Sequence, residues 1–274
     1  MYADLHLHST FSDGTDTPIE LLKMAEESNI KVIAISDHDS VEGVKTINNS
    51  NLNIDVRLIP AIEISTIFNH RYMHILGYYI NIYSDDLASF ITKISAEKTE
   101  NTRINFQNAK ERCRLSYEWD RVVELNRDQP RISGVHVVKA MEHDKIQLQG
   151  MSLWEMFKKY FRAESPYFIE TERMTVYDAI NIINKVNGIP VIAHPKSIGD
   201  DSIVLDLIDY GARGIEVFHP IHSKEERKKY DQIAKDKKLY ITGGSDWHGK
   251  NSDPEIAHIG ICGLTHDGYE ILQL

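Results

Sequence analysis

Short apolar runs and amphipathic helical stretches alternate along both ends of this chain, which is the pattern of an α/β protein with buried parallel strands. The strands that the apolar runs predict span residues 3–9, 31–36, 57–65, 71–80, 188–193, 214–218, 239–243 and 255–262. Helices are predicted from Pro18, behind the N-cap candidate Thr17, from about Ser40, and over residues 176–183, 201–210 and 224–238.

The middle of the chain breaks this alternation. Residues 85–114 are polar with helical character, and no strand pattern appears before about Phe168. Short helices fit this stretch best. We therefore expect a barrel domain made of residues 1–84 and 171–274, with residues 85–170 inserted as a mostly helical cap.

Length and charge narrow the classes of function. The chain has 274 residues, which fits one large domain or one domain with an insertion, and its net charge is −10. This net negative charge disfavours binding of duplex DNA, which needs a basic surface. A small anionic substrate is still compatible with the charge, because bound divalent cations would make the local field positive. With two cysteines, no apolar run near the ~20 residues of a membrane span and no signal peptide, we expect a monomeric cytoplasmic protein without disulfides.

Residues that commonly ligate metals recur at one position in the pattern. On the first strand, His6 and His8 are two residues apart and point to one face, while Leu5 and Leu7 point to the other. The candidates at or just beyond the ends of later strands are His38, Glu63, His194, His219, Asp246 and His248. Because the loops after parallel strands converge at one face of a barrel, we expect these side chains to share a site. Histidine and carboxylate ligands without thiolates suit Mn, Fe or Zn.

Each motif also has a simpler interpretation. The segment around His38 fits a capped helix start, His74 fits a hydrogen-bonded core histidine, and Asp13 fits a turn. Glu63 ends a predicted buried strand, where an unpaired carboxylate is costly, so metal coordination is the natural compensation.

Taken in order, the motifs resemble the PHP family, named for polymerase and histidinol phosphatase domains. The matching segments are Asp4-Leu5-His6-Leu7-His8-Ser9, Ser36-Asp37-His38-Asp39, Glu63, His74, Ala193-His194-Pro195 and Gly244-Ser245-Asp246-Trp247-His248-Gly249. The resemblance implies a distorted (β/α)7 barrel that binds three divalent metal ions. The ligand sets that it implies are His6, His8, Glu63 and Asp246 for the first ion, Glu63, His74 and His194 for the second, and Asp13, His38 and His248 for the third.

Within the family, the inserted segment and the run from Gly214 to Pro220 are most similar to small phosphoesterases acting on nucleotides. Those include nucleoside 3′,5′-bisphosphate phosphatases and 5′-to-3′ exonucleases on short RNA. They usually carry Arg-Pro-His in the cap, where this chain has Gly134 in place of the arginine, and Arg131 is the candidate replacement. The substrate-binding candidates are Ser12, Arg131, His136, Lys196 and His219, and the catalytic candidates are Asp246 and His219.

Three functions are compatible with the sequence. The first is a metal-dependent phosphoesterase that hydrolyses small nucleotides or the 5′ ends of short single-stranded RNA, through a hydroxide held between two metals. The second is a phosphatase of a non-nucleotide metabolite such as histidinol phosphate. The third is a non-catalytic binding domain, against which the complete set of ligands argues.

Overall fold

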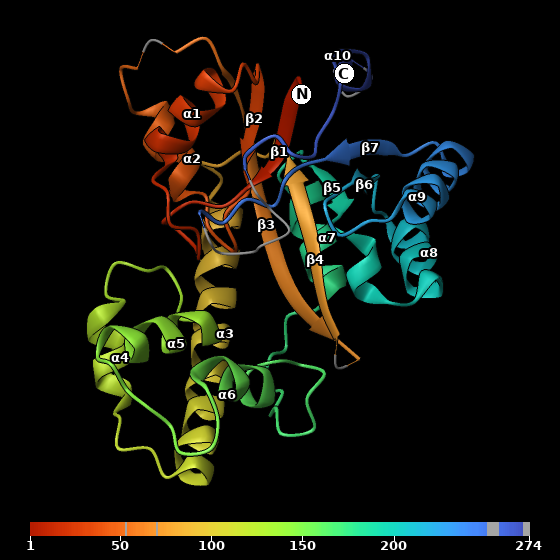
Figure 1. Ribbon diagram of the computed structural model, residues 1–274. Coiled ribbons are helices and arrows are strands. Elements are labelled where there is room, and N and C mark those ends of the chain that lie inside the picture. Colours follow the sequence, from red (N-terminus) through yellow and green to blue (C-terminus); the bar gives the residue numbers. More distant parts are fainter. Residues whose placement is uncertain (53, 70, 251–257, 271–274) are drawn as a thin grey trace.

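The computed structural model describes residues 1–52, 54–69, 71–250 and 258–270 and shows a sheet with helices around it and a helical cap at one end (Figure 1). Its strands are β1 Ala3–Leu7, β2 Val32–Ile35, β3 Arg57–Phe68, β4 Arg71–Tyr78, β5 Ile189–Ile192, β6 Gly214–Phe218 and β7 Tyr240–Gly243. Each coincides with a predicted strand to within a few residues. The sheet has seven strands in chain order, β1 to β7.

One strand departs from the parallel arrangement. Strand β4 is antiparallel to both β3 and β5, whereas the other neighbouring strands are parallel. The cause is local, because β3 ends at Phe68 and β4 begins at Arg71, and a parallel crossover needs a dozen or more residues. Strand β3 also extends beyond its predicted end at residue 65, so Glu63 lies within the strand and not at its end.

The segment after β7 covers the free edge of β1. The His8 N–H donates to the Trp247 carbonyl and the Asp246 N–H to the His6 carbonyl, both at 2.9 Å. Together these bonds nearly close the sheet into a barrel, which confirms the expected distorted (β/α)7 fold. The strand predicted over residues 255–262 is wrong for its described part, since residues 258–262 form turns and bends, while residues 255–257 lie outside the described chain.

The helices cover the outside of the barrel and build the cap. They are α1 Pro18–Glu27, α2 Glu42–Asn48, α3 Asp85–Cys113, α4 Trp119–Leu125, α5 Gly134–His143, α6 Leu153–Tyr160, α7 Val176–Lys185, α8 Asp201–Tyr210, α9 Lys224–Lys237 and α10 His266–Glu270, with a 3₁₀ turn, η1, at Pro195–Ile198. The predicted start of α1 is confirmed, because Thr17 is the N-cap directly before Pro18 and forms a capping box with Glu20. Of the described residues, none belongs to a helix that is long and apolar enough to span a membrane.

A register shift in β1 changes the side of the sheet to which its side chains point. The register against β2 shifts between Asp4 and Leu7. As a result Leu5 packs with the residues on the inner side of the barrel, such as Leu76, and Leu7 packs with those under the helices. The prediction that Leu5 and Leu7 share a face is therefore wrong. His6 and His8 are both completely buried at the barrel mouth.

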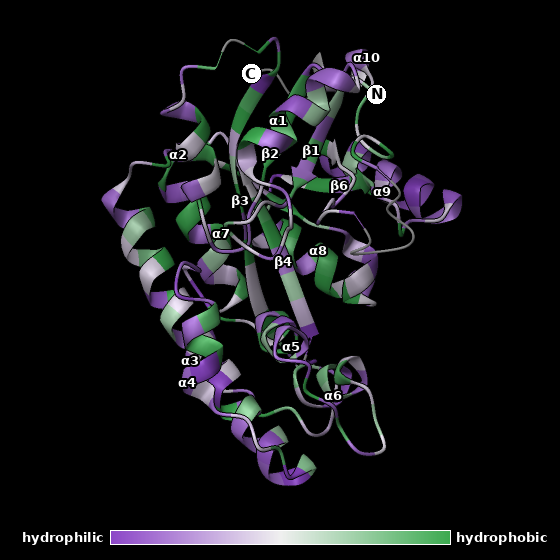
Figure 2. Ribbon diagram, turned by 60° about the vertical axis from the view of Figure 1, so that its left-hand side comes forward, coloured by the Kyte–Doolittle hydropathy of each residue, from purple (hydrophilic) through white to green (hydrophobic). Residues whose placement is uncertain are grey.

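The cap has an apolar core of its own. Helix α3 contributes Leu87 and Ile94 to the barrel core near its start, and Phe106 and Ala109 to a separate cluster with α4, α5 and α6 near its end. This helix mixes hydrophilic and hydrophobic residues along its length (Figure 2). It therefore ties the cap to the barrel, and it holds the cap beside the end of the β3–β4 hairpin (Figure 1).

Candidate metal centre and active site

Glu63 is the centre of the site. Its Oε1 lies 3.0 Å from Nδ1 of His74 and 3.1 Å from Nε2 of His194. Its Oε2 lies 3.3 Å from Nε2 of both His6 and His8, and 3.0 Å from Nδ1 of His38. This carboxylate is 1% exposed and projects inward from β3, so five imidazoles from four strands or strand ends converge on it.

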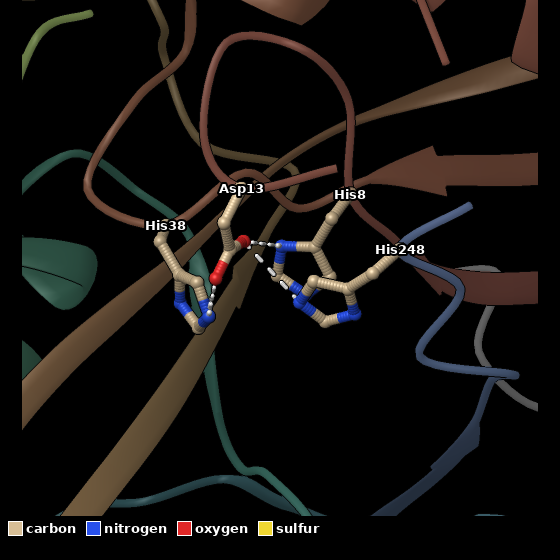
Figure 3. Close-up of side chains that lie close together, drawn as sticks. All are labelled: His8, Asp13, His38 and His248. Atoms are coloured by element: carbon tan, nitrogen blue, oxygen red, sulfur yellow. Dashed lines mark ion pairs between the residues drawn. The ribbon is translucent and has the colours of Figure 1, made fainter. Parts of the chain in front are cut away.

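Asp13 gathers a second group of histidines (Figure 3). It comes from the loop after β1, and its carboxylate lies 3.3 Å from Nε2 of His248 and 4.0 Å from ring nitrogens of His8 and His38. Burial opposes ionisation of Asp13, but the charges of His248 and His38 hold its pKa well below the usual range. The loop thus brings one carboxylate to histidines that follow three different strands.

Asp246 links the two groups. Its Oδ1 lies 3.3 Å from Nε2 of His6 and 3.1 Å from Nε2 of His8, and its Oδ2 lies 3.3 Å from Nε2 of His219. The backbone carbonyl of Asp246 lies 2.8 Å from Nδ1 of His248, which fixes that ring as well. Asp246 has a left-handed backbone with φ of 55°, which turns its side chain into the barrel mouth directly after β7.

The donor set fits divalent cations. Buried side-chain atoms without a hydrogen-bond partner include Nε2 of His6, both ring nitrogens of His8, Oδ1 of Asp13 and Oε2 of Glu63. Such atoms are costly to bury unless something binds them. Groups of at least three ligand atoms lie within 4.8 Å of one another, among them His6, His8 and Glu63, or His8, Asp13, His38 and His248. The histidine and carboxylate clusters can therefore hold metal ions.

Neighbouring imidazoles in this site have opposite pKa shifts. Burial disfavours the charged ring of His8, yet the adjacent carboxylates of Asp246 and Glu63 raise its pKa to about 10. For His38, burial prevails over the nearby carboxylates and lowers the pKa to about 4. The charge of the neighbouring His8 also opposes a charge on His38, so the two rings shift in opposite directions.

A cavity of about 370 Å³ opens from the ligands toward the cap. The barrel side is lined by ligand candidates such as Glu63, His74 and His194, together with His219. The cap side presents charged and aromatic side chains, namely Lys98, Arg131, Arg162, Glu164, Glu172, Phe157, Phe161 and Phe168, with Tyr72 of β4 beside them. Lys98 pairs with Glu172 at 3.3 Å and Arg162 with Glu164 at 3.4 Å. A phosphoryl group at the ligands would thus face three cations, each paired with a carboxylate, and aromatic rings on the opposite wall.

The structure does not bring every substrate-binding candidate to this cavity. Of the described residues, Arg131 and His219 line it, and Ser12, His136 and Lys196 do not. The Ser12 hydroxyl donates to Asp37 at 2.6 Å, and the Lys196 amine donates to the Ile221 carbonyl at 2.8 Å.

His136 is a contact between cap and barrel. Its Nδ1 accepts the Ser133 N–H at 3.0 Å, and its Nε2 lies 3.1 Å from the Ser12 carbonyl. Both ring nitrogens are therefore engaged by the protein. The residue is 4% exposed.

Packing explains the glycine at position 134. A Cβ on Gly134 would lie 2.7 Å from Cβ of Phe161, because α5 begins directly against the end of α6. A longer side chain does not fit there. Arg131, three residues earlier, instead reaches the cavity wall, where its Nε lies 2.9 Å from Oδ2 of Asp39.

Sequence reasoning missed at least five charged residues of the site, namely Lys98, Arg162, Glu164, Glu172 and Glu216. Lys98 of α3 and Arg162 line the cavity, and no pattern in their segments distinguishes them from ordinary surface cations. Glu216 contacts His6 from within β6. A lone acidic residue in the apolar run of residues 214–218 was a signal that could have identified it.

Fold and site together define a class of protein, a nearly closed α/β barrel with histidine and carboxylate clusters able to bind metal ions beside a helical cap. The chain belongs to the PHP domain family, whose profile matches residues 4–174. It is 26% identical over 95% of its length to the phosphoribosyl 1,2-cyclic phosphate 1,2-diphosphodiesterase of Eggerthella lenta, of which it covers 98%. It is also 26% identical over 89% of its length to the 5′-3′ exoribonuclease Rnm of Salmonella typhimurium and to the 3′,5′-nucleoside bisphosphate phosphatase of Chromobacterium violaceum, covering 84% and 86% of them.

Solved structures agree with the family assignment. A candidate metal-dependent phosphoesterase from Bifidobacterium adolescentis superposes with a TM-score of 0.82 at 25% identity, over 99% of this chain and 95% of its own. A Chromobacterium violaceum structure described as an amidohydrolase with bound sulfate gives a TM-score of 0.79 at 24% identity, over 96% of this chain and 91% of its own, and it supports the fold alone.

Proposed function

We propose that this protein is a metal-dependent phosphoesterase whose substrate is a ribose carrying phosphoryl groups at two positions, as in a nucleoside bisphosphate or a short 5′-phosphorylated RNA. The observation that carries the proposal is the cavity itself. It joins a cluster of buried carboxylates and imidazoles to a wall that carries three cations, Arg131, Lys98 and Arg162. These cations are paired with Asp39, Glu172 and Glu164, and a phosphoryl group can bind to them beside these partners. One phosphoryl group can be cleaved at the cluster while a second anion is held by the wall.

Three divalent ions, Mn, Fe or Zn, are part of the proposal. The first would be held by His6, His8, Glu63 and Asp246, the second by Glu63, His74 and His194, and the third by Asp13, His38 and His248, to which His8 adds a ring nitrogen in the structure. When bound, such ions lower the pKa of a coordinated water and neutralise phosphoryl oxygens.

The protein's own side chains then orient and transfer protons. Asp246 is placed to accept a proton from the attacking water, because it lies among the ligands with one oxygen toward His219. His219 lines the cavity, and its Nδ1 accepts the Ile221 N–H at 3.3 Å, so Nε2 carries the proton that the imidazole can donate to the leaving oxygen. Arg131 binds the second phosphoryl group and is held in place by Asp39.

The relatives support a substrate with two phosphoryl groups. Their names specify a phosphoribosyl cyclic phosphate, a nucleoside 3′,5′-bisphosphate and RNA, and a second phosphate on the sugar or chain is common to these. Aromatic rings on the cap wall, such as Phe157, Phe161 and Phe168, offer a surface on which a base can stack. Histidinol phosphate carries a single phosphate, so it offers no second anion for Arg131 to bind.

Three further expectations belong to this proposal. The enzyme acts as a monomer in the cytoplasm, its barrel comprises residues 1–84 and 171–274, and residues 85–170 form the cap that binds the substrate. Light scattering of the purified protein checks the monomer. Duplex DNA is not expected to bind a protein of net charge −10.

The test is phosphate release by protein reconstituted with Mn²⁺. The substrates compared are adenosine 3′,5′-bisphosphate, a short 5′-phosphorylated RNA, a ribose 5-phosphate 1,2-cyclic phosphate and histidinol phosphate. We expect hydrolysis of at least one of the first three and little of the fourth. Activity on histidinol phosphate alone would refute the two-phosphate substrate, and no hydrolysis by metal-loaded protein would favour a binding domain.

A variant of Arg131 provides a second test. Arg131→Met removes a charged hydrogen-bond donor worth about 1.5–3 kcal/mol, so kcat/KM for the bisphosphate should fall roughly 10- to 100-fold. Most of this loss should appear in KM. Arg103→Met is the matched control, because Arg103 lies on the exposed side of α3 and pairs with Glu100.

A further inference from the structure

Glu216 is a completely buried acidic residue in the middle of β6, and the roles proposed above do not use it. Its neighbours Ile215 and Val217 are apolar and pack under the helices, while the Glu216 side chain points the other way, into the barrel. A buried carboxylate is expensive unless its oxygens are fully paired. Its contacts therefore indicate what it does.

Each carboxylate oxygen of Glu216 meets a different ligand candidate. Oε1 lies 3.0 Å from Nδ1 of His6, on β1. Oε2 accepts the backbone N–H of His194 at 2.7 Å, directly after β5. His194 has a left-handed backbone with φ of 26°, which is unfavourable for a residue with a Cβ, and this hydrogen bond helps to hold it.

The pairing determines which nitrogen of each ring is free. Because Nδ1 of His6 donates its proton to Glu216, the lone pair of His6 is on Nε2, which faces Glu63 and Asp246. In His194, Nδ1 lies 2.8 Å from the Ser197 hydroxyl, which itself donates to the His194 carbonyl, so Nδ1 carries the proton there too. Both rings present Nε2 toward the cluster.

We infer that Glu216 is a positioning residue for the metal centre, which fixes the Nδ1–H tautomer of His6 and the strained backbone of His194 so that both rings offer Nε2 to metal. Second-layer carboxylates of this kind typically account for 10- to 100-fold in metal affinity. The inference rests on the proposed metal-dependent function and adds the residue that organises two of its ligands.

Glu216 could alternatively be a metal ligand itself, since its carboxylate, His6 and His219 offer three atoms within 4.8 Å of one another. Two contacts argue against this role. Oε2 accepts the backbone N–H of His194, and this amide cannot give up its proton to make room for an ion. An ion at Oε1 would displace the proton of His6 Nδ1. Glu216 is therefore assigned to the layer behind the ligands.

The substitution Glu216→Gln tests the tautomer directly. A glutamine has nearly the same shape, but its one oxygen can accept from only one partner. The His194 N–H must donate, so the amide oxygen turns to it and the amide NH₂ faces Nδ1 of His6. That ring must then accept at Nδ1 and carry its proton on Nε2, the nitrogen that metal requires.

We expect metal-stripped E216Q to bind Mn²⁺ at the His6 site 10- to 100-fold more weakly than wild type in calorimetric titrations. In the Zn²⁺-loaded wild type, ¹⁵N–¹H spectra should place the His6 proton on Nδ1, and in E216Q that signature should be lost. Tyr78→Phe is the matched control. It deletes another buried hydrogen bond inside the barrel, from the Tyr78 hydroxyl to the Leu5 carbonyl at 2.9 Å, and touches no ligand nitrogen.

The outcomes separate this inference from the proposed function. Equal Mn²⁺ affinity in E216Q and wild type, or an equal loss in Y78F, overturns the role of Glu216 and leaves the phosphoesterase intact. A wild type that binds no divalent ion overturns both. If E216Q does not fold, Glu216→Asp is measured in its place. It keeps the charge but cannot reach both partners, so its loss of affinity should exceed that of Y78F.

Discussion

His136 is expected to stabilise the joint between cap and barrel in a manner that depends on pH. Burial lowers the pKa of His136 to about 4, from the 6.5 of an exposed histidine. Between these two values the unfolded chain binds more protons than the folded one, so stability rises with pH across the window. The contribution of His136 is complete above pH 6.5 and is lost as the pH falls toward 4.

The size of the effect follows from the shift. Each pKa unit corresponds to about 1.36 kcal/mol, so the difference between 6.5 and about 4 amounts to roughly 3 kcal/mol over the whole window, and to about 2 kcal/mol by pH 5. His136→Asn keeps an acceptor for the Ser133 N–H but cannot reach the Ser12 carbonyl. Its cost at pH 7.5 should be about 1–3 kcal/mol, the price of a lost buried hydrogen bond.

Urea unfolding of wild type and H136N at pH 7.5 and pH 5.0 provides the assay. The difference in the free energy of unfolding should be about 1–3 kcal/mol at pH 7.5 and should nearly vanish at pH 5.0, because wild type has by then lost its advantage. The metal ligands also titrate in this range, but they are common to both proteins and cancel in the difference. His143→Asn, at an exposed position of the same helix, is the control. A difference that is equal at both pH values, or a raised KM without any change in stability, would refute the reasoning.

Three other substitutions probe the site and the cap. Glu63→Gln removes one negative charge from the metal centre. The attraction lost between two unit charges 4 Å apart is about 4 kcal/mol, so the Kd for metal should rise roughly 10³-fold, and metal analysis of purified E63Q should find little bound metal. His219→Asn should lower kcat roughly 10²- to 10⁴-fold with unchanged metal content, and loss of metal would instead make His219 a ligand. Gly134→Ala should lower cap stability by about 1–3 kcal/mol in thermal unfolding, because its Cβ would lie 2.7 Å from Phe161, and an unchanged melting temperature would show that α6 can move away.

The sequence alone determined the seven strands of the sheet, though it also predicted one that is absent, as well as the inserted helical stretch and most ligand candidates. Apolar runs such as residues 31–36 and 214–218 are short, continuous and bounded by turns, so their identity as buried strands is a local property. Residues that follow such strands must lie at one face of a parallel barrel. For this reason His38, His194 and Asp246 could be placed together without any knowledge of distances.

Tertiary structure decided which atoms meet. The reversal of β4, the register shift in β1 and the left-handed backbone of His194 depend on pairing between distant segments, and no local pattern encodes them. The same holds for contacts across the chain. Ser12 faces Asp37 and not the cavity, and Glu216 meets His6 from 210 positions away, because burial forces each polar atom to find a partner wherever the fold provides one.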